Sequence, residues 1–262
     1  MPELPDVEVF RKYVDRTALH QTIESVEVFA PDILGEVTPK QLQSKTKGHQ
    51  FMSTDRHGKY LFTRLSNDGW LVFHFGMTGY FHYFKDSKQT PKHTRALFNF
   101  DNGHHLAFVL QRKLGSISAT QEMDTFVKEQ GLGLDALDDN LHPEAFKKAL
   151  KEAKSSIKSA LMDQERIAGI GNIYSDEILF QARLDPKTRA NQLSNEDVDR
   201  LFEAMKEVLE TAIDSEADPE KMPETYLLPH REKGGKCPVC HGEIETTKIS
   251  GRSAYFCPNC QS

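Results

Sequence analysis

The spacing of hydrophobic residues changes twice along the chain, which divides it into a helical start, a strand-rich middle and a second helical part. Val7, Phe10 and Val14 recur at helical intervals, so we expect an amphipathic helix over residues 2–20. Between residues 22 and 120 the apolar positions instead form short runs of aromatic and β-branched side chains, separated by Gly, Asn and Asp. These runs predict strands at residues 25–29, 50–54, 60–65, 70–75, 79–84, 96–100, 105–109 and 115–119. Many short strands with frequent turns are typical of a β-sandwich.

Helical spacing returns in the second half of the chain. Residues 126–140 have little pattern and are expected to form a weakly structured linker. Helices are predicted at residues 143–163, 172–181 and 195–212, followed by a loop over residues 213–233. The chain is therefore predicted to have an α+β fold. An N-terminal helix and β-sandwich domain (1–125) precede a helical domain (126–233) and a C-terminal ribbon (234–262).

The cysteines all lie in the C-terminal ribbon. They form two Cys-x2-Cys pairs, Cys237 with Cys240 and Cys257 with Cys260, separated by sixteen residues. This spacing is within the range of zinc sites with four thiolate ligands, and it indicates a reducing compartment rather than a disulfide framework. Four protein ligands leave no open coordination position, so we predict one structural Zn²⁺ and no catalytic metal.

Composition and charge place limits on the possible partners. The chain has no apolar run of membrane-spanning length and no export leader, so we expect no membrane partner and a bacterial-type cytoplasmic location. The net charge of −6 argues mildly against a nucleic-acid partner. However, residues 194–224 alone carry eleven acids, whereas residues 40–64 carry six basic side chains against Asp55 only. The acidic surplus is therefore local, and it leaves room for a basic face elsewhere.

The first residues carry the most specific candidate chemistry. Met1 is normally removed before a small residue, which leaves Pro2 as a secondary amine at the N-terminus. An α-amine has a pKa of about 7.7–8, and a helix start favours its neutral, nucleophilic form. Such an amine condenses with an aldehyde to a charged iminium, as Schiff-base lysines do. Glu3 would supply protons, and Asp6 follows on the same helix face. The alternative is an ordinary helix start with acids in its first turn.

Residues 2–8, Pro-Glu-Leu-Pro-Asp-Val-Glu, resemble the N-terminal signature of the formamidopyrimidine-DNA glycosylase/endonuclease VIII family of base-excision repair enzymes. Similar blocks follow in the family's order at residues 74–79, at residues 161–180, which resemble its helix–two-turn–helix, and in the four-cysteine ribbon. Together these blocks span nearly the whole chain. The resemblance implies a bifunctional DNA glycosylase/AP lyase, acting as a monomer on double-stranded DNA that contains damaged bases or abasic sites.

The resemblance also implies roles in the reaction. Pro2 would attack C1′ of an extruded nucleotide, and Glu3 would open the sugar ring and move protons. Lys59, in a basic turn after Gly58, corresponds to a lysine that contacts the phosphate beside the lesion and assists β-elimination. Arg252, at the tip of the ribbon, corresponds to an arginine that grips phosphates and assists δ-elimination. Without the resemblance, Lys59 and Arg252 would be ordinary exposed side chains.

Further residues are assigned to DNA binding. His74 opens a loop that would project Met77 into the gap left by an extruded base, although a methionine more often fills a core. His93 resembles a phosphate contact of the family. Arg112 corresponds to the arginine that pairs with the base opposite the lesion, and Leu114 stands where phenylalanine is usual.

The block at residues 161–180 also has a direct physical interpretation. Gly169 and Gly171 allow the backbone to approach a phosphate, with N–H groups facing it at the start of a helix. Asn172 is expected to be the N-cap of that helix, and its amide can also bind a phosphate. Lys154 and Lys158, four apart on the preceding predicted helix, are expected to be phosphate partners. The alternative is a plain helix pair joined by a glycine turn.

Three departures from the oxidised-purine branch of the family bear on the substrate. Asp6 stands where Glu is usual, Leu114 and Leu110-Gln111 replace a Phe and an Asp-Pro around Arg112, and the loop at residues 213–236 is short for a lesion-capping segment. We therefore expect oxidised pyrimidines and hydantoin-like bases to be cut faster than 8-oxoguanine opposite cytosine. One alternative is a preference for oxidised purines, 8-oxoguanine and formamidopyrimidine. Another is a zinc-ribbon DNA-binding protein without catalysis, against which the intact Pro2, Glu3 and Lys59 speak.

Overall fold

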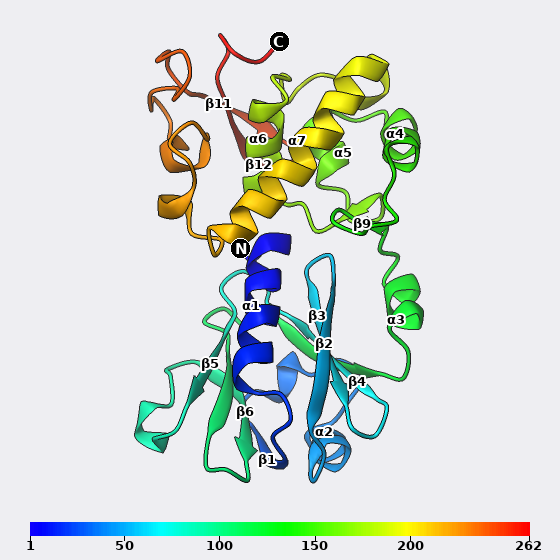
Figure 1. Cartoon of the computed structure of the whole chain (residues 1–262), viewed down its shortest axis with the longest axis vertical. Helices are drawn as coiled ribbons and strands as arrows, with labels where there is room; N and C mark the ends of the chain where they lie inside the picture. The colour runs from blue at the N-terminus through cyan, green and yellow to red at the C-terminus, as the bar shows by residue number, and fades with distance from the viewer. The chain divides into compact units, whose positions relative to one another are not determined.

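The computed structural model describes the whole chain, residues 1–262, as two compact units. The first unit comprises Met1–Pro2 and Asp6–Gln130, and the second comprises Glu3–Pro5 and Gly131–Ser262. The N-terminal helix α1 (Leu4–Thr17) therefore contributes residues to both (Figure 1). Most of the strand residues lie in the first unit and most of the helical residues in the second, which confirms the predicted α+β fold.

Two four-stranded sheets form the body of the first unit. One has the strand order β1-β6-β7-β5 and the other the order β2-β3-β4-β8, and all neighbouring strands are antiparallel. The strands are β1 Ile23–Val28, β2 Phe51–His57, β3 Tyr60–Leu65, β4 Trp70–His74, β5 Tyr80–Phe84, β6 Thr94–Phe100, β7 His105–Val109 and β8 Ser116–Thr120. Every predicted strand is present, with its ends shifted by at most three residues.

Aromatic side chains fill the space between the two sheets. The ring centroid of Phe73 on β4 lies 6.0 Å from that of Phe98 on β6 and 5.4 Å from that of Phe108 on β7. Val7 and Val14 of α1 are fully buried in the same core. Because side chains of both sheets meet in one core, the first unit is the predicted β-sandwich.

The hydrophobic pattern missed two helices of the first unit. Helix α2 (Pro39–Thr46) begins with a capping box, in which Thr38 and Gln41 each accept a hydrogen bond from the backbone N–H of the other. Helix α3 (Met123–Glu129) lies where the sequence predicts a weakly structured linker. The ring of Phe126 packs 5.6 Å from that of Phe62 on β3, so burial of one aromatic side chain orders this segment. The unit also has 3-10 turns at Pro31–Ile33 and Ser87–Gln89.

Helices dominate the second unit. They are α4 Pro143–Lys151, α5 Ile157–Leu161, α6 Asn172–Gln181 and α7 Asn195–Asp214, with 3-10 turns at Ala190–Gln192, Pro219–Lys221 and Leu228–His230. The short strands β9 (Leu134–Asp135) and β10 (Ile167–Ala168) form a parallel pair, and β11 (Glu245–Ile249) with β12 (Arg252–Phe256) forms the ribbon hairpin. Helix α6 has the predicted bounds. The core of the unit lies between α4, α6 and α7, where the rings of Phe146 and Phe202 are 5.3 Å apart.

The prediction of one continuous helix over residues 143–163 is wrong. The chain leaves the helical path after α4 and starts again at α5, which Ser156 caps by accepting a hydrogen bond from the backbone N–H of its third residue. In the break, Ala190 N donates to the carbonyl of Ser155, a long-range bond that a continuous helix would exclude. Lys154 therefore lies in the break and Lys158 lies in α5, so the two do not share a helix.

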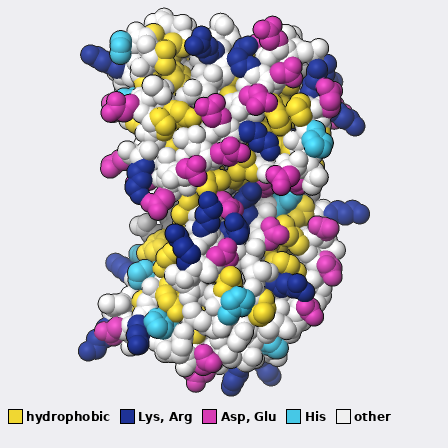
Figure 2. All heavy atoms as spheres, viewed as in Figure 1, with side chains coloured by type: hydrophobic (Ala, Val, Ile, Leu, Met, Phe, Trp, Pro, Cys, Tyr) yellow, Lys and Arg dark blue, Asp and Glu magenta, His cyan; other side chains and the backbone are white.

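Charged side chains of both signs are present on the face of the molecule that Figure 2 shows. Figure 2 shows acidic and basic side chains interspersed over the visible face of each unit. No helix in the structure combines the length and the apolar character needed to cross a membrane.

Candidate functional site

The start of α6 holds the carboxylate of Glu3. The Glu3 side chain is fully buried, and its Oε2 accepts hydrogen bonds from Gly171 N at 2.7 Å and from Tyr174 N at 3.2 Å. Its Oε1 accepts from Ile173 N at 2.9 Å. N–H groups at a helix start have no partner inside the helix and carry the positive end of its dipole. This negative group is therefore fixed directly after Pro2 in the chain.

This arrangement changes the predicted roles of Gly171 and Asn172. The N-cap of α6 is Gly171, with a φ of −129°, so the prediction of Asn172 as the N-cap is wrong. The N–H of Gly171 is committed to Glu3 and does not face an open phosphate site. A Cβ on Gly171 would lie 2.3 Å from Cδ of Glu3, so a side chain at this position would displace the carboxylate. Asn172 is half-buried, and its Oδ1 has no hydrogen-bond partner within the protein.

Gln164 shapes the turn that precedes α6. Its amide nitrogen donates to the carbonyls of Met162 and Ile170, and its oxygen accepts from Gly169 N at 3.1 Å. Gly169 has a φ of 113°, and a Cβ there would lie 2.5 Å from the side chain of Leu4. Leu4 N in turn donates to the carbonyl of Gly169 at 3.0 Å. The glycine turn therefore fixes the residue next to Glu3.

A buried ionic network lies beside the first turn of α6. Lys158 Nζ is 2.5 Å from Asp176 Oδ1 and donates to the carbonyl of Asn172 at 3.0 Å. The side chains of Lys158 and Asp176 have no exposed surface. Burial lowers the pKa of Lys158, and the charge of Asp176 opposes this effect. Because the ammonium points inward, the structure does not support the predicted phosphate contact of Lys158.

The tip of the ribbon hairpin lies beside α5. Ser250 and Gly251 join β11 to β12 with φ values of 48° and 75°, as a tight hairpin turn requires. The hydroxyl of Ser250 is 2.7 Å from that of Ser159, and Arg252 Nη1 is 3.5 Å from the sulfur of Met162. Arg252 remains exposed, so its guanidinium can still reach a ligand.

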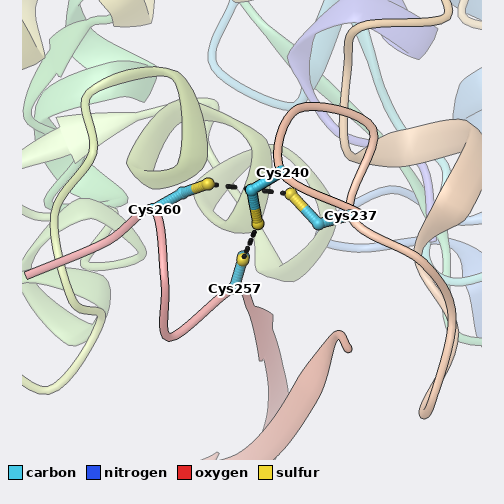
Figure 3. Close-up of side chains that lie close together, drawn as sticks. All are labelled: Cys237, Cys240, Cys257 and Cys260. Atoms are coloured by element: carbon cyan, nitrogen blue, oxygen red, sulfur yellow. Dashed lines mark hydrogen bonds between the residues drawn. The ribbon is translucent and has the colours of Figure 1, made fainter. Parts of the chain in front are cut away.

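The four cysteine side chains converge in the ribbon, as Figure 3 shows. Their sulfur atoms all lie within 4.8 Å of one another, with 3.8 Å between Cys237 and Cys260 and 3.4 Å between Cys240 and Cys257. Zinc–sulfur bonds of about 2.3 Å in a tetrahedral site place neighbouring sulfurs roughly 3.8 Å apart. The four thiolates therefore fit one structural zinc ion with no open position, which confirms the predicted cofactor.

Lys59 lies in the turn that joins β2 to β3 in the first unit. Gly58, with a φ of 55°, occupies the first of the two turn positions and Lys59 the second. Arg56 fastens this turn to α1, because its Nη1 donates to the carbonyl of Gly58 at 3.1 Å and its Nε donates to Glu8 at 3.3 Å. The Lys59 side chain is half-buried on a turn with a fixed backbone.

His74 ends β4 in the same unit. Its ring centroid lies 4.9 Å from that of Tyr60. Burial lowers the pKa of His74, and the positive charge of Lys59 lowers it further. The neutral imidazole is therefore favoured, so a ligand of His74 would be bound through hydrogen bonds rather than through a charge.

Two glycine-containing loops of the first unit lie against each other and expose apolar side chains. A Cβ on Gly76 would lie 2.6 Å from the backbone of Leu114, so the absence of a side chain allows this close approach. Met77 and Leu114 are 39% and 56% exposed, so Met77 is not core filler. Arg112 is exposed beside them, and its backbone N–H donates to Thr78 at 3.4 Å. Apolar side chains presented in this way suit insertion between bases.

The remaining predicted residues are Pro2, Asp6, His93 and Lys154. Pro2 is half-buried, and Asp6 is half-buried in the first turn of α1. His93 has a left-handed backbone with a φ of 69°, and its Nδ1 is 3.5 Å from a guanidinium nitrogen of Arg95. Lys154 is exposed in the break after α4. Nothing in these positions assigns a ligand by itself.

Glu177 anchors the segment that follows α7, a role that the sequence interpretation missed. One oxygen accepts from Leu228 N at 2.7 Å, and the other accepts from Leu227 N at 3.0 Å and from the Gln181 side chain at 2.9 Å. The predicted loop is thereby fixed against α6. The available signal was the pair of acids Asp176 and Glu177 in a short helix that is otherwise largely apolar.

The burial of Glu177 predicts a pH-dependent stability. Burial raises the pKa of Glu177 from about 4.5 to about 7, so folding takes up a proton between these pH values. The stabilising contribution is fully present below about pH 4.5 and is lost as the pH rises through about 7. The unfolding free energy lost over this pH range is on the order of 3 kcal/mol. In urea denaturation, the unfolding free energy of the wild type should fall relative to that of Glu177→Gln as the pH rises through this window. A difference that does not vary with pH would contradict this assignment.

Family models match nearly the whole chain. The formamidopyrimidine-DNA glycosylase N-terminal domain matches residues 1–117, the formamidopyrimidine-DNA glycosylase H2TH domain matches residues 132–222, and a zinc finger found in FPG and IleRS matches residues 234–262. Among curated relatives, the formamidopyrimidine-DNA glycosylase of Carboxydothermus hydrogenoformans is 34% identical over 271 residues, with all of both chains covered. That of Acaryochloris marina is 35% identical over 283 residues, which cover 100% of this chain and 99% of the relative.

Solved structures give the same result for the fold. Lactococcus lactis Fpg (MutM) in complex with a FAPY-dG containing DNA has a TM-score of 0.91 at 27% identity, covering 99% of this chain and 100% of that chain. A structure of MutM in complex with carbocyclic 8-oxo-G containing DNA has a TM-score of 0.91 at 28% identity, with both chains fully covered. The likeness therefore extends over both units and the ribbon.

Proposed function

The chain belongs to the formamidopyrimidine-DNA glycosylase family, whose members are DNA glycosylases of base-excision repair with AP lyase activity, and we propose that Pro2 is its nucleophile. The observation that best supports this proposal is the anchoring of Glu3. Three N–H groups at the start of α6 hold the carboxylate of the residue that follows Pro2. A fixed carboxylate next to an N-terminal amine is what proton transfer to an opening sugar ring requires.

The reaction follows from the chemistry of these groups. The lone pair of the Pro2 nitrogen attacks C1′, the bond from C1′ to the base breaks, and the base leaves with that electron pair and takes up a proton. Attack leaves the Pro2 nitrogen as an ammonium, whose proton passes to the Glu3 carboxylate. Glu3 then donates this proton to O4′ as the ring opens, which leaves an iminium between Pro2 and C1′. Loss of a C2′ proton then expels the 3′ phosphate by β-elimination, and a second elimination expels the 5′ phosphate. Lys59 and Arg252 serve these steps as phosphate contacts.

DNA binding is assigned to groups in each unit. In the first unit, Met77 and Leu114 act as apolar wedges and Arg112 pairs with the base opposite the lesion. In the second unit, the amide of Asn172 and the guanidinium of Arg252 bind phosphates. The partner is duplex DNA with damaged bases or abasic sites, bound by a monomer in the cytoplasm.

The names of the curated relatives support oxidised purines as substrates. The differences of this chain from the oxidised-purine branch instead predict oxidised pyrimidines. The relatives compared above are named formamidopyrimidine-DNA glycosylases and align with essentially the whole chain. The departures concern only Asp6, the residues around Arg112 and one loop. We therefore assign formamidopyrimidine and 8-oxoguanine as the preferred substrates. Asp6 and Leu114 are then tolerated variations of the lesion and opposite-base contacts.

Single-turnover kinetics on matched duplexes test this function. We expect formamidopyrimidine and 8-oxoguanine opposite cytosine to be released faster than thymine glycol and 5-hydroxyuracil. Each duplex that loses its damaged base should also be nicked. An undamaged duplex is the control. Faster release of the two pyrimidines would restore the preference predicted from Asp6 and Leu114. Binding without base release or nicking on any duplex would favour the non-catalytic alternative.

A further inference from the structure

Arg231 connects three parts of the second unit through one side chain. Its guanidinium donates two hydrogen bonds to Asp176 Oδ2, at 2.9 and 2.7 Å, and one to the carbonyl of Asn172 at 3.4 Å. Its Cζ also lies 4.4 Å from the ring centroid of Tyr255 on β12, in a cation–π contact. Arg231 itself follows the 3-10 turn Leu228–His230. It therefore links the start of α6, the zinc ribbon and the segment between α7 and the ribbon.

The charges of this network depend on one another. Asp176 is completely buried, and its two oxygens are divided between Lys158 on Oδ1 and Arg231 on Oδ2. A buried carboxylate is tolerated when its lone pairs are satisfied, and it becomes costly when one partner is removed. Lys158 and Arg231 also share the carbonyl of Asn172 as an acceptor. Loss of Arg231 would therefore leave Asp176 Oδ2 without its partner and remove one of the two side chains that bond the Asn172 carbonyl.

We propose that Arg231 is a positioning residue for DNA binding, which fixes the first residue of α6 so that the side chain of Asn172 meets a phosphate. This inference rests on the proposed function, in which Asn172 contacts DNA. Arg231 does not itself serve as the phosphate ligand, because its side chain is only 17% exposed and its donors are directed at Asp176 and the Asn172 carbonyl. The contact with the Tyr255 ring holds the Arg231 side chain in place from the other side.

A double-mutant cycle between Arg231 and Asn172 tests this role. The readout is equilibrium binding, at one fixed salt concentration, to a duplex that carries a tetrahydrofuran abasic-site analogue. We expect Arg231→Gln to weaken binding about tenfold, and the double variant with Asn172→Ala to bind no more weakly than Asn172→Ala alone. Once the side chain of Asn172 is absent, the position of its backbone no longer matters for affinity. Additive losses would overturn the proposal.

Two further measurements separate positioning from a general effect of charge. Lysine keeps the charge but cannot bond Asp176 through a planar fork and reach the Asn172 carbonyl as well, so Arg231→Lys should also bind weakly. In Arg231→Gln the slope of log affinity against log salt should stay at the wild-type value, because the weakened contact of Asn172 is uncharged and no cationic phosphate contact is lost. Wild-type affinity in Arg231→Lys, or a slope reduced by about one, would show instead that Arg231 acts through its charge.

Arg200 provides a matched control in the same unit. It likewise donates to a carbonyl and a carboxylate, to Ala182 O at 2.8 Å and to Asp197 at 2.6 Å. Arg200→Gln should leave DNA affinity unchanged. If Arg231→Gln does not fold, as judged by its thermal transition and zinc content, the cycle is run with Arg231→Lys. If the wild type neither binds nor nicks abasic DNA, the proposed function fails. If the wild type binds and the losses are additive, only the role of Arg231 fails.

Discussion

Borohydride is expected to fix the chain covalently to a duplex with an abasic site when Pro2 is the first residue, and to give only background trapping when Met1 is retained. The secondary amine of Pro2 can form an iminium with the sugar aldehyde, and reduction makes that bond permanent. When Met1 precedes it, the Pro2 nitrogen is an amide and has no available lone pair. The effect is close to all-or-none, because no positioning by Glu3 or Lys59 can restore a nucleophile. Trapping is measured as a shifted protein–DNA band on a denaturing gel.

The control for this experiment is binding without chemistry. The Met1-retaining form should bind a tetrahydrofuran duplex as the processed form does, because the proposed phosphate contacts lie at Lys59, Asn172 and Arg252. Equal affinity with unequal trapping then assigns the loss to the nucleophile. Equal trapping of the two forms would remove Pro2 from the mechanism and point to a lysine amine.

Features with a local or metal-imposed pattern were predictable from the sequence. Short runs of aromatic and β-branched residues predict the strands of the sandwich. Helix α6 (Asn172–Gln181) was predicted to start directly after the glycine turn, and it does. The zinc site was predictable because the metal dictates the cysteine spacing. The break between α4 and α5 was not, because residues 152–156 contain no Pro or Gly. Bonds from the segment at residues 188–190 create that break, and the local sequence carries no sign of them.

The buried residues of the candidate site were less predictable, because segments that are distant in the sequence hold them in place. Lys158 had the spacing of an exposed phosphate ligand, yet its partner Asp176 lies eighteen residues away and draws it into the core. Arg231 and Asp176 are fifty-five residues apart, so no periodic pattern links them. Glu3 was predictable as an acid beside an amine, but its three donors come from a turn about 170 residues later in the chain. Glu3 and Lys158 could be singled out from the sequence, whereas the groups that hold them depend on tertiary contacts.

Gly171→Ala is expected to reduce base release about a hundredfold or more while leaving the fold intact. A methyl group at Gly171 would lie 2.3 Å from Cδ and 2.4 Å from Oε1 of Glu3, so the carboxylate must leave its three N–H donors. Positioned acid–base groups contribute about 10²–10⁴ in rate, which sets the size of the loss. The backbone itself tolerates alanine, since the φ of Gly171 is −129°. Single-turnover release of formamidopyrimidine, together with the thermal transition, measures the two effects separately.

The comparison with Glu3→Gln decides whether the loss acts through the carboxylate. Glutamine keeps the shape of Glu3 but not its charge, and its NH₂ group faces donors rather than acceptors. If Gly171→Ala acts by displacing Glu3, the double variant should be no slower than the slower of the two single variants, since one function is lost in both. Gly69→Ala is the control, because the atom nearest to a Cβ at that position is 3.6 Å away. The rate of base release by Gly69→Ala should equal that of the wild type.

Full activity of Gly171→Ala would mean that catalysis does not need the Glu3 carboxylate at the start of α6. A double variant slower by the product of the two losses would give Gly171 a separate role, such as close approach of its backbone to a phosphate.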